Sequence, residues 1–168
     1  ITEDQLLKLY VVSKNANGLR HLIGDKESGI EYEGHFLKLS EEDISRVRSA
    51  VEHDEGLMSV VNVWRKISDY VYEEFNEVYR KQTGVDLPYE EYFTHLNVSD
   101  TFLPSEKTKE MHIPGQSAFQ QVSGMPSTAK ARKRSTAPIK LEGLLWSGQK
   151  SIEITAQYAG LAEPTKIA

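Results

Sequence analysis

The stretch "LMSVVNVWRKISDYVYEEFNEVYRKQT" (residues 57–83) decides the fold, because its apolar residues recur at steps of three and four. Such spacing predicts an α-helix with an apolar stripe. Gly84 follows directly and fits the position at which a helix ends. At 1.5 Å per residue this helix is roughly 40 Å long, so we expect it to be a spine on which other segments pack. The residues of the pattern are Leu57, Val60, Val61, Trp64, Ile67, Val71, Phe75, Val78 and Tyr79.

A shorter helix is expected at the start of the chain. Thr2 and Gln5 have the T-x-x-Q spacing of a capping box, and apolar residues follow at helical spacing. The sequence "NANG" (15–18) stops this periodicity, so we predict a helix over residues 2–14. Residues 19–24 fit one or two further helical turns.

A second short helix is expected before the spine. Ser40 precedes two glutamates, which favour the positive end of a helix dipole, and apolar residues follow at helical spacing up to "HDEG" (53–56). We therefore predict a helix over residues 40–53. Upstream of it, residues 30–39 fit either a short hairpin around Gly34 or an extended link.

The chain changes character at Val85. All six prolines lie beyond this residue, and proline restricts itself and the residue before it to extended backbone. We therefore expect residues 85–140 to form a long extended strap. Aromatic side chains spaced along such a segment indicate that it wraps the helices instead of being disordered. The expected anchors are Tyr89, Tyr92, Phe93, Phe102 and Phe119.

Helical periodicity returns after Pro138, and we predict a C-terminal helix and tail over residues 141–168, bent at Gly148 and ended by Pro164. The sequence thus predicts a mainly α protein, with a long central helix, shorter packing helices and the extended Pro-rich strap. Residues 1–84 form its helical part. Because the first residue is not methionine, we expect the chain to be one module of a longer polypeptide.

The charge is divided unevenly along the chain, whose net charge is −5. Residues 1–100 carry 11 Lys and Arg against 20 Asp and Glu, whereas residues 101–168 carry 9 against 5. The acidic part is unsuited to gripping phosphates, so any nucleic-acid contact belongs to the last third. No apolar run reaches the ~18 residues that a membrane span needs.

The polar side of the spine carries a row of carboxylates at four-residue spacing, Asp69, Glu73 and Glu77. A glycosidase uses two carboxylates about 5–9 Å apart, but such a pair needs a cleft that separates their pKa values. Arg65 and Lys81 flank the row at the same spacing. We therefore expect Arg65–Asp69 and Glu77–Lys81 to form ion pairs on a solvated helix face.

Other motifs that carry chemistry are missing from the sequence. None of the five histidines has a partner at H-x-x-x-H spacing, and His53 lies in an acidic run whose neighbouring side chains diverge on a helix. The chain has no cysteine, no Gly-rich phosphate loop and no G-x-S-x-G motif. We expect no catalytic residue, no metal site and no cofactor.

A basic cluster stands out in "SGMPSTAKARKRSTAPIKLEG" (residues 123–143). It either pairs with carboxylates of this chain or of a protein partner, binds nucleic acid, or is merely solvated. The twenty carboxylates of residues 1–100 favour pairing. Stacking on bases is disfavoured, because no aromatic residue lies between Phe119 and Trp146. The cluster consists of Lys130, Arg132, Lys133 and Arg134.

Three stretches resemble parts of the very large multi-domain (polyvalent) proteins that tailed bacteriophages package in the virion: residues 2–22, 69–96 and 127–164. In the second stretch the matching residues are Asn76, Tyr79, Thr83, Gly84, Leu87, Pro88, Tyr92 and Phe93. In the third they are Lys130, Arg132 or Lys133, Ser135, Pro138, Ala156, Tyr158, Glu163 and Pro164. The chain departs from the pattern at Thr94, where proline is usual, and at Gln157, where histidine is common.

The resemblance implies a location and a class of protein. Such polypeptides are ejected with the genome, and some carry a virion RNA polymerase or another enzyme elsewhere in the chain. We therefore expect a non-catalytic structural or interaction module in the capsid interior or tail, whose partners are other virion proteins or other segments of its parent chain. The alternative is a nucleic-acid-binding accessory segment of a virion-packaged polymerase or ejection protein. Oligomerisation is compatible with either function.

Overall fold

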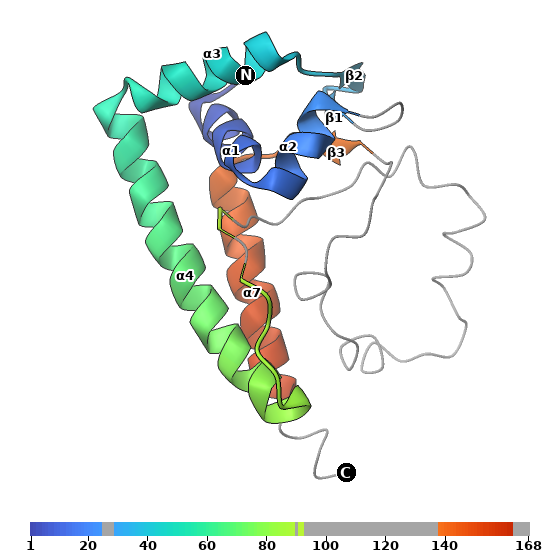
Figure 1. The fold of residues 1–168 in the computed structure, drawn as a ribbon, viewed down its shortest axis with the longest axis vertical. Coiled ribbons are helices and arrows are strands. Elements are labelled where there is room, and N and C mark those ends of the chain that lie inside the picture. The colour runs from blue at the N-terminus through green and yellow to red at the C-terminus, as the bar shows by residue number, and fades with distance from the viewer. Residues whose placement is uncertain (25–28, 90, 93–137, 163–168) are drawn as a thin grey trace, which may run out of the picture.

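A computed structural model describes residues 1–24, 29–89, 91–92 and 138–162, and it is mainly helical, as the sequence predicts (Figure 1). The longest element is the predicted spine. In chain order the elements are α1 (Glu3–Lys14), α2 (Ala16–Ile23), β1 (Ile30–Tyr32), β2 (His35–Leu37), α3 (Glu41–Glu52), α4 (Glu55–Thr83), β3 (Ile139–Lys140) and α7 (Leu144–Ala162).

The two longest helices, α4 and α7, lie side by side and run in the same direction (Figure 1). Trp64 meets Gly148 in their upper part, and further down the ring of Phe75 stacks on that of Tyr158 with centroids 4.5 Å apart. Helix α3 runs along the top of the molecule, and its C-terminal end meets the upper end of α4 at a corner (Figure 1). Helices α1 and α2 and the small sheet lie beside α3, above α7 (Figure 1).

The helix boundaries follow the capping signals. Thr2 and Gln5 form the predicted capping box of α1, and Ser40 caps α3. Gly84 ends α4 in the left-handed conformation at φ 79°, which favours glycine. One prediction needs correction: Asn15 stops α1, but its side chain accepts hydrogen bonds from two amides of the following turn, so the rest of "NANG" (15–18) begins α2.

Residues 30–37 form a hairpin, which is one of the two structures that fit the sequence; the other was an extended link. Strands β1 and β2 are antiparallel, and their turn has positive φ at Glu33 and Gly34, as a two-residue hairpin requires. Strand β3 pairs in parallel with β1, with Ile139 opposite Ile30. The sequence pattern places Ile139 in the strap expected over residues 85–140 and predicts no strand there.

The core is centred on α1, which contributes to two adjoining clusters. One cluster joins α1 to α3, α4 and α7, and the other joins it to α2, α3 and the sheet. The buried residues of the first are Leu7, Tyr10, Val11, Val51, Val61, Trp64 and Leu144. Those of the second are Leu9, Val12, Leu22, Ile30, Ile44 and Ile139.

Small side chains line the buried face of α7. Ser147, Ser151 and Thr155 each donate a hydrogen bond to the carbonyl four residues earlier, so their hydroxyls are satisfied within the helix. Gly148 lies on the same face and admits the ring of Trp64. Gly148 was expected to bend the helix, whereas α7 runs without interruption from Leu144 to Ala162, and the glycine serves close packing instead.

Not all residues of the spine pattern are buried. Val60 and Ile67, which the sequence groups with the core residues, are 38% and 39% exposed. Helix α4 therefore has an apolar stripe wider than the surface that α1, α3 and α7 cover.

Candidate interaction surface

Immediately after α4 the chain turns back and runs along that helix toward its upper end (Figure 1). We call residues 85–89 and 91–92 the strap segment, because they are the described beginning of the strap expected over 85–140. Five residues of α4, and one residue between α1 and α2, hold it through hydrogen bonds, ion pairs or aromatic contacts. They are Arg65, Asp69, Tyr72, Asn76, Arg80 and Asn15.

The lower part of the strap segment is anchored by Asn76, which is buried. Its side-chain oxygen accepts a hydrogen bond of 2.7 Å from the Leu87 amide, and its side-chain nitrogen donates one of 3.0 Å to Asp86. Arg80 pairs with the same carboxylate at 2.7 Å. The hydrogen bond from Asn76, followed by Arg80, lowers the pKa of Asp86 below the ordinary aspartate value.

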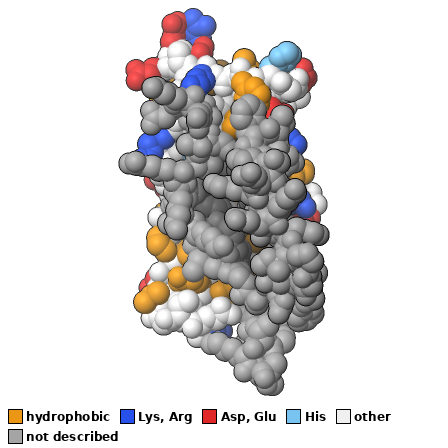
Figure 2. Space-filling model, turned by 90° about the vertical axis from the view of Figure 1, so that its right-hand side faces the viewer, with side chains coloured by type: hydrophobic (Ala, Val, Ile, Leu, Met, Phe, Trp, Pro, Cys, Tyr) orange, Lys and Arg blue, Asp and Glu red, His pale blue; other side chains and the backbone are white. Residues whose placement is uncertain are grey.

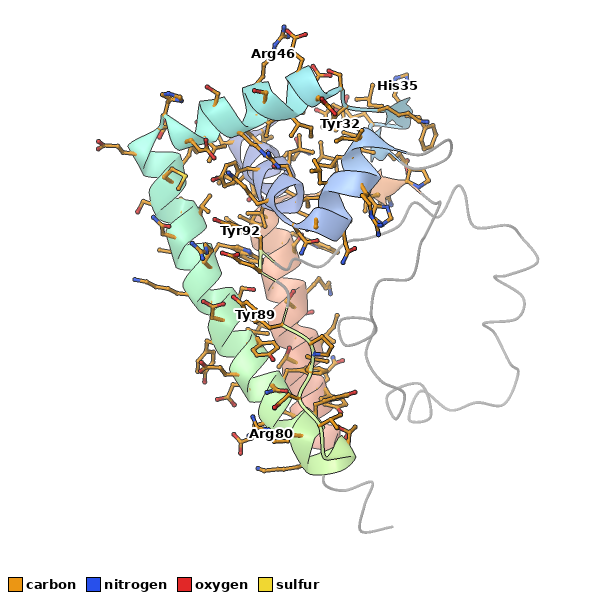
Figure 3. The ribbon with its side chains drawn as sticks, viewed as in Figure 1. Tyr32, His35, Arg46, Arg80, Tyr89 and Tyr92 are labelled. Carbon is orange, nitrogen blue, oxygen red and sulfur yellow. The ribbon has the colours of Figure 1, made fainter. Side chains whose placement is uncertain are left out.

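The middle of the strap segment is held by Tyr72 of α4 and by Tyr89, which Figure 3 labels. Their rings meet edge to face with centroids 5.0 Å apart. The Tyr72 hydroxyl donates to the Leu87 carbonyl at 2.6 Å, and the Tyr89 hydroxyl donates to Asp69 at 2.8 Å. The hydrogen bond to the Asp69 carboxylate raises the pKa of Tyr89, because it favours the protonated phenol.

The upper part of the strap segment is held by Arg65. Its guanidinium lies 2.8 Å from Glu91 and 4.8 Å from the ring centroid of Tyr92, a cation–π contact. Asn15 donates to the Glu91 carbonyl at 3.0 Å and attaches the segment to the junction between α1 and α2. The predicted Arg65–Asp69 pair is therefore wrong, since both side chains contact the strap segment instead.

The other predicted ion pair of the spine is confirmed, because Lys81 lies 2.7 Å from Glu77. Tyr89 and Tyr92, two of the five expected anchors, contact α4 as described. The other three, Phe93, Phe102 and Phe119, lie outside the described residues, as does the basic cluster of Lys130, Arg132, Lys133 and Arg134. Their roles stay predictions.

A buried lysine–serine pair is not predictable from sequence spacing, since its members are 139 residues apart. The buried Lys8 ammonium lies 2.5 Å from Ser147 Oγ, which lies 3.0 Å from the Gly143 carbonyl. A serine nucleophile gives its proton to a neutral base. Here the hydroxyl donates to the carbonyl and accepts from the lysine, and Ser147 has no exposed surface. The pair therefore has a structural role, because it joins α1 to α7.

The carboxylate row of α4 is used for contacts with neighbouring residues. Asp69 accepts from Tyr89, Glu77 pairs with Lys81, and all three acids of the row are exposed. Among the described residues no group of three or more His, Asp or Glu side chains is placed to hold a metal ion. Within the same part of the chain, no helix is both long and apolar enough to cross a membrane.

Charged side chains of both signs gather at the upper end of the molecule (Figure 2). Helix α3 contributes the exposed pair Arg46–Glu42 to this end. On the face that Figure 2 shows, charges of the two signs are interspersed and form no patch of a single sign.

Comparisons with family models, with curated proteins and with solved structures give no match to this chain.

Proposed function

We propose that this chain is a non-catalytic structural and interaction module of a large multi-domain protein that tailed bacteriophages package in the virion and eject with the genome. The resemblance of residues 69–96 and 127–164 motivates the proposal, and the placement of the matching residues supports it. Asn76 and Leu87 join the strap segment to α4. Tyr158, from the other stretch, stacks on Phe75, the neighbour of Asn76.

These contacts give the matching residues a physical role. Thr83 and Gly84 end the spine, Asn76 receives the returning chain, and Tyr158 brings α7 alongside. These matching residues therefore hold the strap segment and α7 against α4, which is a structural role. A module of this kind supplies a stiff helix pair with a chain segment strapped along it, which suits a connecting role between other parts of a long polypeptide.

The observation that carries the proposal is the attachment of the strap segment from Arg80 to Arg65, four turns of α4 at 3.6 residues per turn. The side chains on this side of α4 bind the backbone and the side chains of the strap segment. Other virion proteins, or other segments of the parent polypeptide, are the partners that we propose for the remaining surface.

Mass spectrometry of purified phage particles tests the proposal. We expect peptides of this chain in the particles, within a polypeptide much longer than 168 residues, and at a constant ratio to the capsid protein. Absence from intact particles, with the same peptides found only in the lysate of infected cells, contradicts a virion role.

The second candidate is a nucleic-acid-binding accessory segment, and the uneven charge favours it, because the last third of the chain is basic. A salt titration of DNA binding separates the two functions. Phosphate contacts are strongest at low salt, so negligible binding at about 50 mM removes this candidate. Binding that is lost when Lys130, Arg132, Lys133 and Arg134 are all replaced by alanine supports it.

If the basic cluster instead fastens the strap to the acidic helices, replacing Arg132 and Arg134 by alanine loosens the strap. We then expect faster proteolysis near residue 130, with DNA binding absent in both the parent and the variant. Unchanged proteolysis contradicts the fastening role.

A further inference from the structure

Four exposed apolar side chains form a stripe on α4: Val60, Val63, Ile67 and Tyr70. Their steps of three, four and three residues are those of the a and d positions in a coiled-coil seam. Their exposed fractions run from 38% at Val60 to 63% at Tyr70. At 100° per residue, the stripe lies about a quarter of a turn from Trp64 and Phe75, which face α7.

Helix α7 carries two further exposed apolar residues, Leu145 and Ile152, at 66% and 48% exposure. They lie about a quarter of a turn from the α4-facing line marked by Gly148 and Tyr158, at 100° per residue. Each helix has a line of residues that faces the other helix. Viewed along the chain direction, the exposed apolar residues lie clockwise from this line on α7 and counterclockwise from it on α4. Because the two helices are parallel and face each other, opposite rotations lead to the same side.

We call the surface formed by these six residues the α4/α7 face. The strap segment occupies the opposite side of the pair, because Asp69 and Asn76 are rotated from the α7-facing line of α4 in the other sense. One long side of the helix pair is thus covered by the chain itself, and the other presents apolar side chains to solvent. Contiguous exposed apolar surface of this kind marks an interaction site.

We infer that the α4/α7 face binds a second copy of this chain, so that two parallel helix pairs form a four-helix bundle about a two-fold axis. Six apolar side chains, each between about one third and two thirds exposed, present several hundred Å² together with the atoms between them. That area approaches the roughly 800 Å² per partner of a specific interface. The inference is independent of the proposed function.

Self-complementarity is what a two-fold interface requires, and the stripe has it in one orientation. With the two α4 helices antiparallel and the axis between Val63 and Ile67, Val63 faces Ile67 of the second copy. Val60 then faces Tyr70, which pairs a small side chain with a large one. Glu74, the next residue of the stripe, faces Gly56 and its carboxylate reaches solvent. A two-fold axis parallel to the helices would instead place α4 of one copy over α7 of the other.

The mass of the 168-residue chain in solution tests the inference. By light scattering we expect twice the monomer mass of 19.0 kDa at about 100 μM, a hundredfold above a micromolar dissociation constant. Ile67→Glu and Leu145→Glu each place a charge in the interface, so both variants are expected to be monomers. Val85→Glu is the control, because Val85 is 58% exposed but lies after α4, at the start of the strap segment.

Unaltered circular dichroism of the glutamate variants separates dissociation from unfolding. A monomeric parent chain overturns the inference and leaves a helix of another protein as the occupant of the face. A dimer that persists in both Ile67→Glu and Leu145→Glu also overturns it, because the contact then lies elsewhere.

Disulfide trapping provides a test that does not depend on destabilising variants. The chain has no cysteine, so single substitutions introduce unique thiols. The antiparallel arrangement brings residue 63 of one copy near residue 67 of the other, within the roughly 4.4–6.8 Å between Cα atoms that a disulfide spans. A mixture of Val63→Cys and Ile67→Cys is therefore expected to form mixed dimers faster than either variant alone forms its own. Faster self-linking of Val63→Cys, or no linking, overturns the arrangement.

Discussion

The indole ring of Trp64 packs against α7 at Gly148, the position of its buried face that has no side chain. A Cβ built on Gly148 lies 3.0 Å from Cη2 of this ring and closer still to Cζ3, so even a methyl group displaces the indole. The approach of α4 to α7 thus depends on a glycine in the middle of a helix.

Gly148→Ala is expected to destabilise the protein. Overpacking a core costs about 1–3 kcal/mol, which outweighs the gain of up to ~1 kcal/mol from the better helix propensity of alanine. Urea unfolding followed by circular dichroism measures the difference. Gly160→Ala in the same helix is the control, because a Cβ at this position meets no atom within 4 Å apart from its chain neighbours and the backbone of its own helix. It is expected to stabilise, and a stable Gly148→Ala with an unstable Gly160→Ala contradicts the packing account.

Asn76→Ala is expected to release the strap segment from α4. The variant loses hydrogen bonds to the Leu87 amide and to Asp86, and leaving a part-buried amide without its acceptor costs about 1–3 kcal/mol. Limited proteolysis after residue 84 measures the release. Glu77→Ala, one position along, removes only an exposed i,i+4 pair worth about 0.3–0.5 kcal/mol and should leave the cleavage rate unchanged. Equal rates in Asn76→Ala and the parent would falsify this role.

Ser147→Ala is expected to destabilise the protein more than Lys8→Met. The alanine removes an acceptor from a buried ammonium, at a cost of about 1–3 kcal/mol, whereas methionine removes the buried charge itself. After Lys8→Met the serine hydroxyl keeps its bond to the Gly143 carbonyl, so we expect a change within ~1 kcal/mol or a small gain. Thermal unfolding of both variants at pH 7 gives the order, and the reverse order contradicts it.

Acid is expected to weaken the attachment of the strap segment through Asp86. The folded-state pKa of Asp86 is lowered, so its contribution to stability is complete above the ordinary value of 3.8 and is lost as the pH falls through the lowered one. Carboxyl carbon NMR gives this pKa directly. In Asn76→Ala it should rise, because the hydrogen bond from Asn76 is the largest cause of the shift. An Asp86 that titrates at or above 3.8 in the parent chain rules the coupling out.

The local elements were predictable from the sequence because their signals are local. The capping box of Thr2 and Gln5, the apolar period of α4 and the glycine at position 84 each act within a few residues, and each appears in the structure. The turn of the hairpin at Gly34 is also a local signal, because its positive φ depends only on the residues within the turn.

The pairing of distant segments was not predictable in this way. Strand β3 has two residues, too few for any period, and its identity depends on β1 more than a hundred residues earlier. Arg65 has two carboxylates within reach, Asp69 by helical spacing and Glu91 by the return of the chain. The second is chosen because the same guanidinium also covers the ring of Tyr92. Spacing along α4 alone favours the wrong partner.

The contact between α1 and α7 also sets when this part of the protein can fold during its synthesis. Lys8 meets Ser147, and Ile30 pairs with Ile139, so the core around α1 stays incomplete until β3 and α7 have left the ribosome. At about 5–20 residues per second, the apolar side chains of α1 wait on the order of ten to thirty seconds for α7. During that interval they are candidates for binding by a chaperone, and this part of the nascent chain becomes resistant to proteases only after α7 has been synthesised.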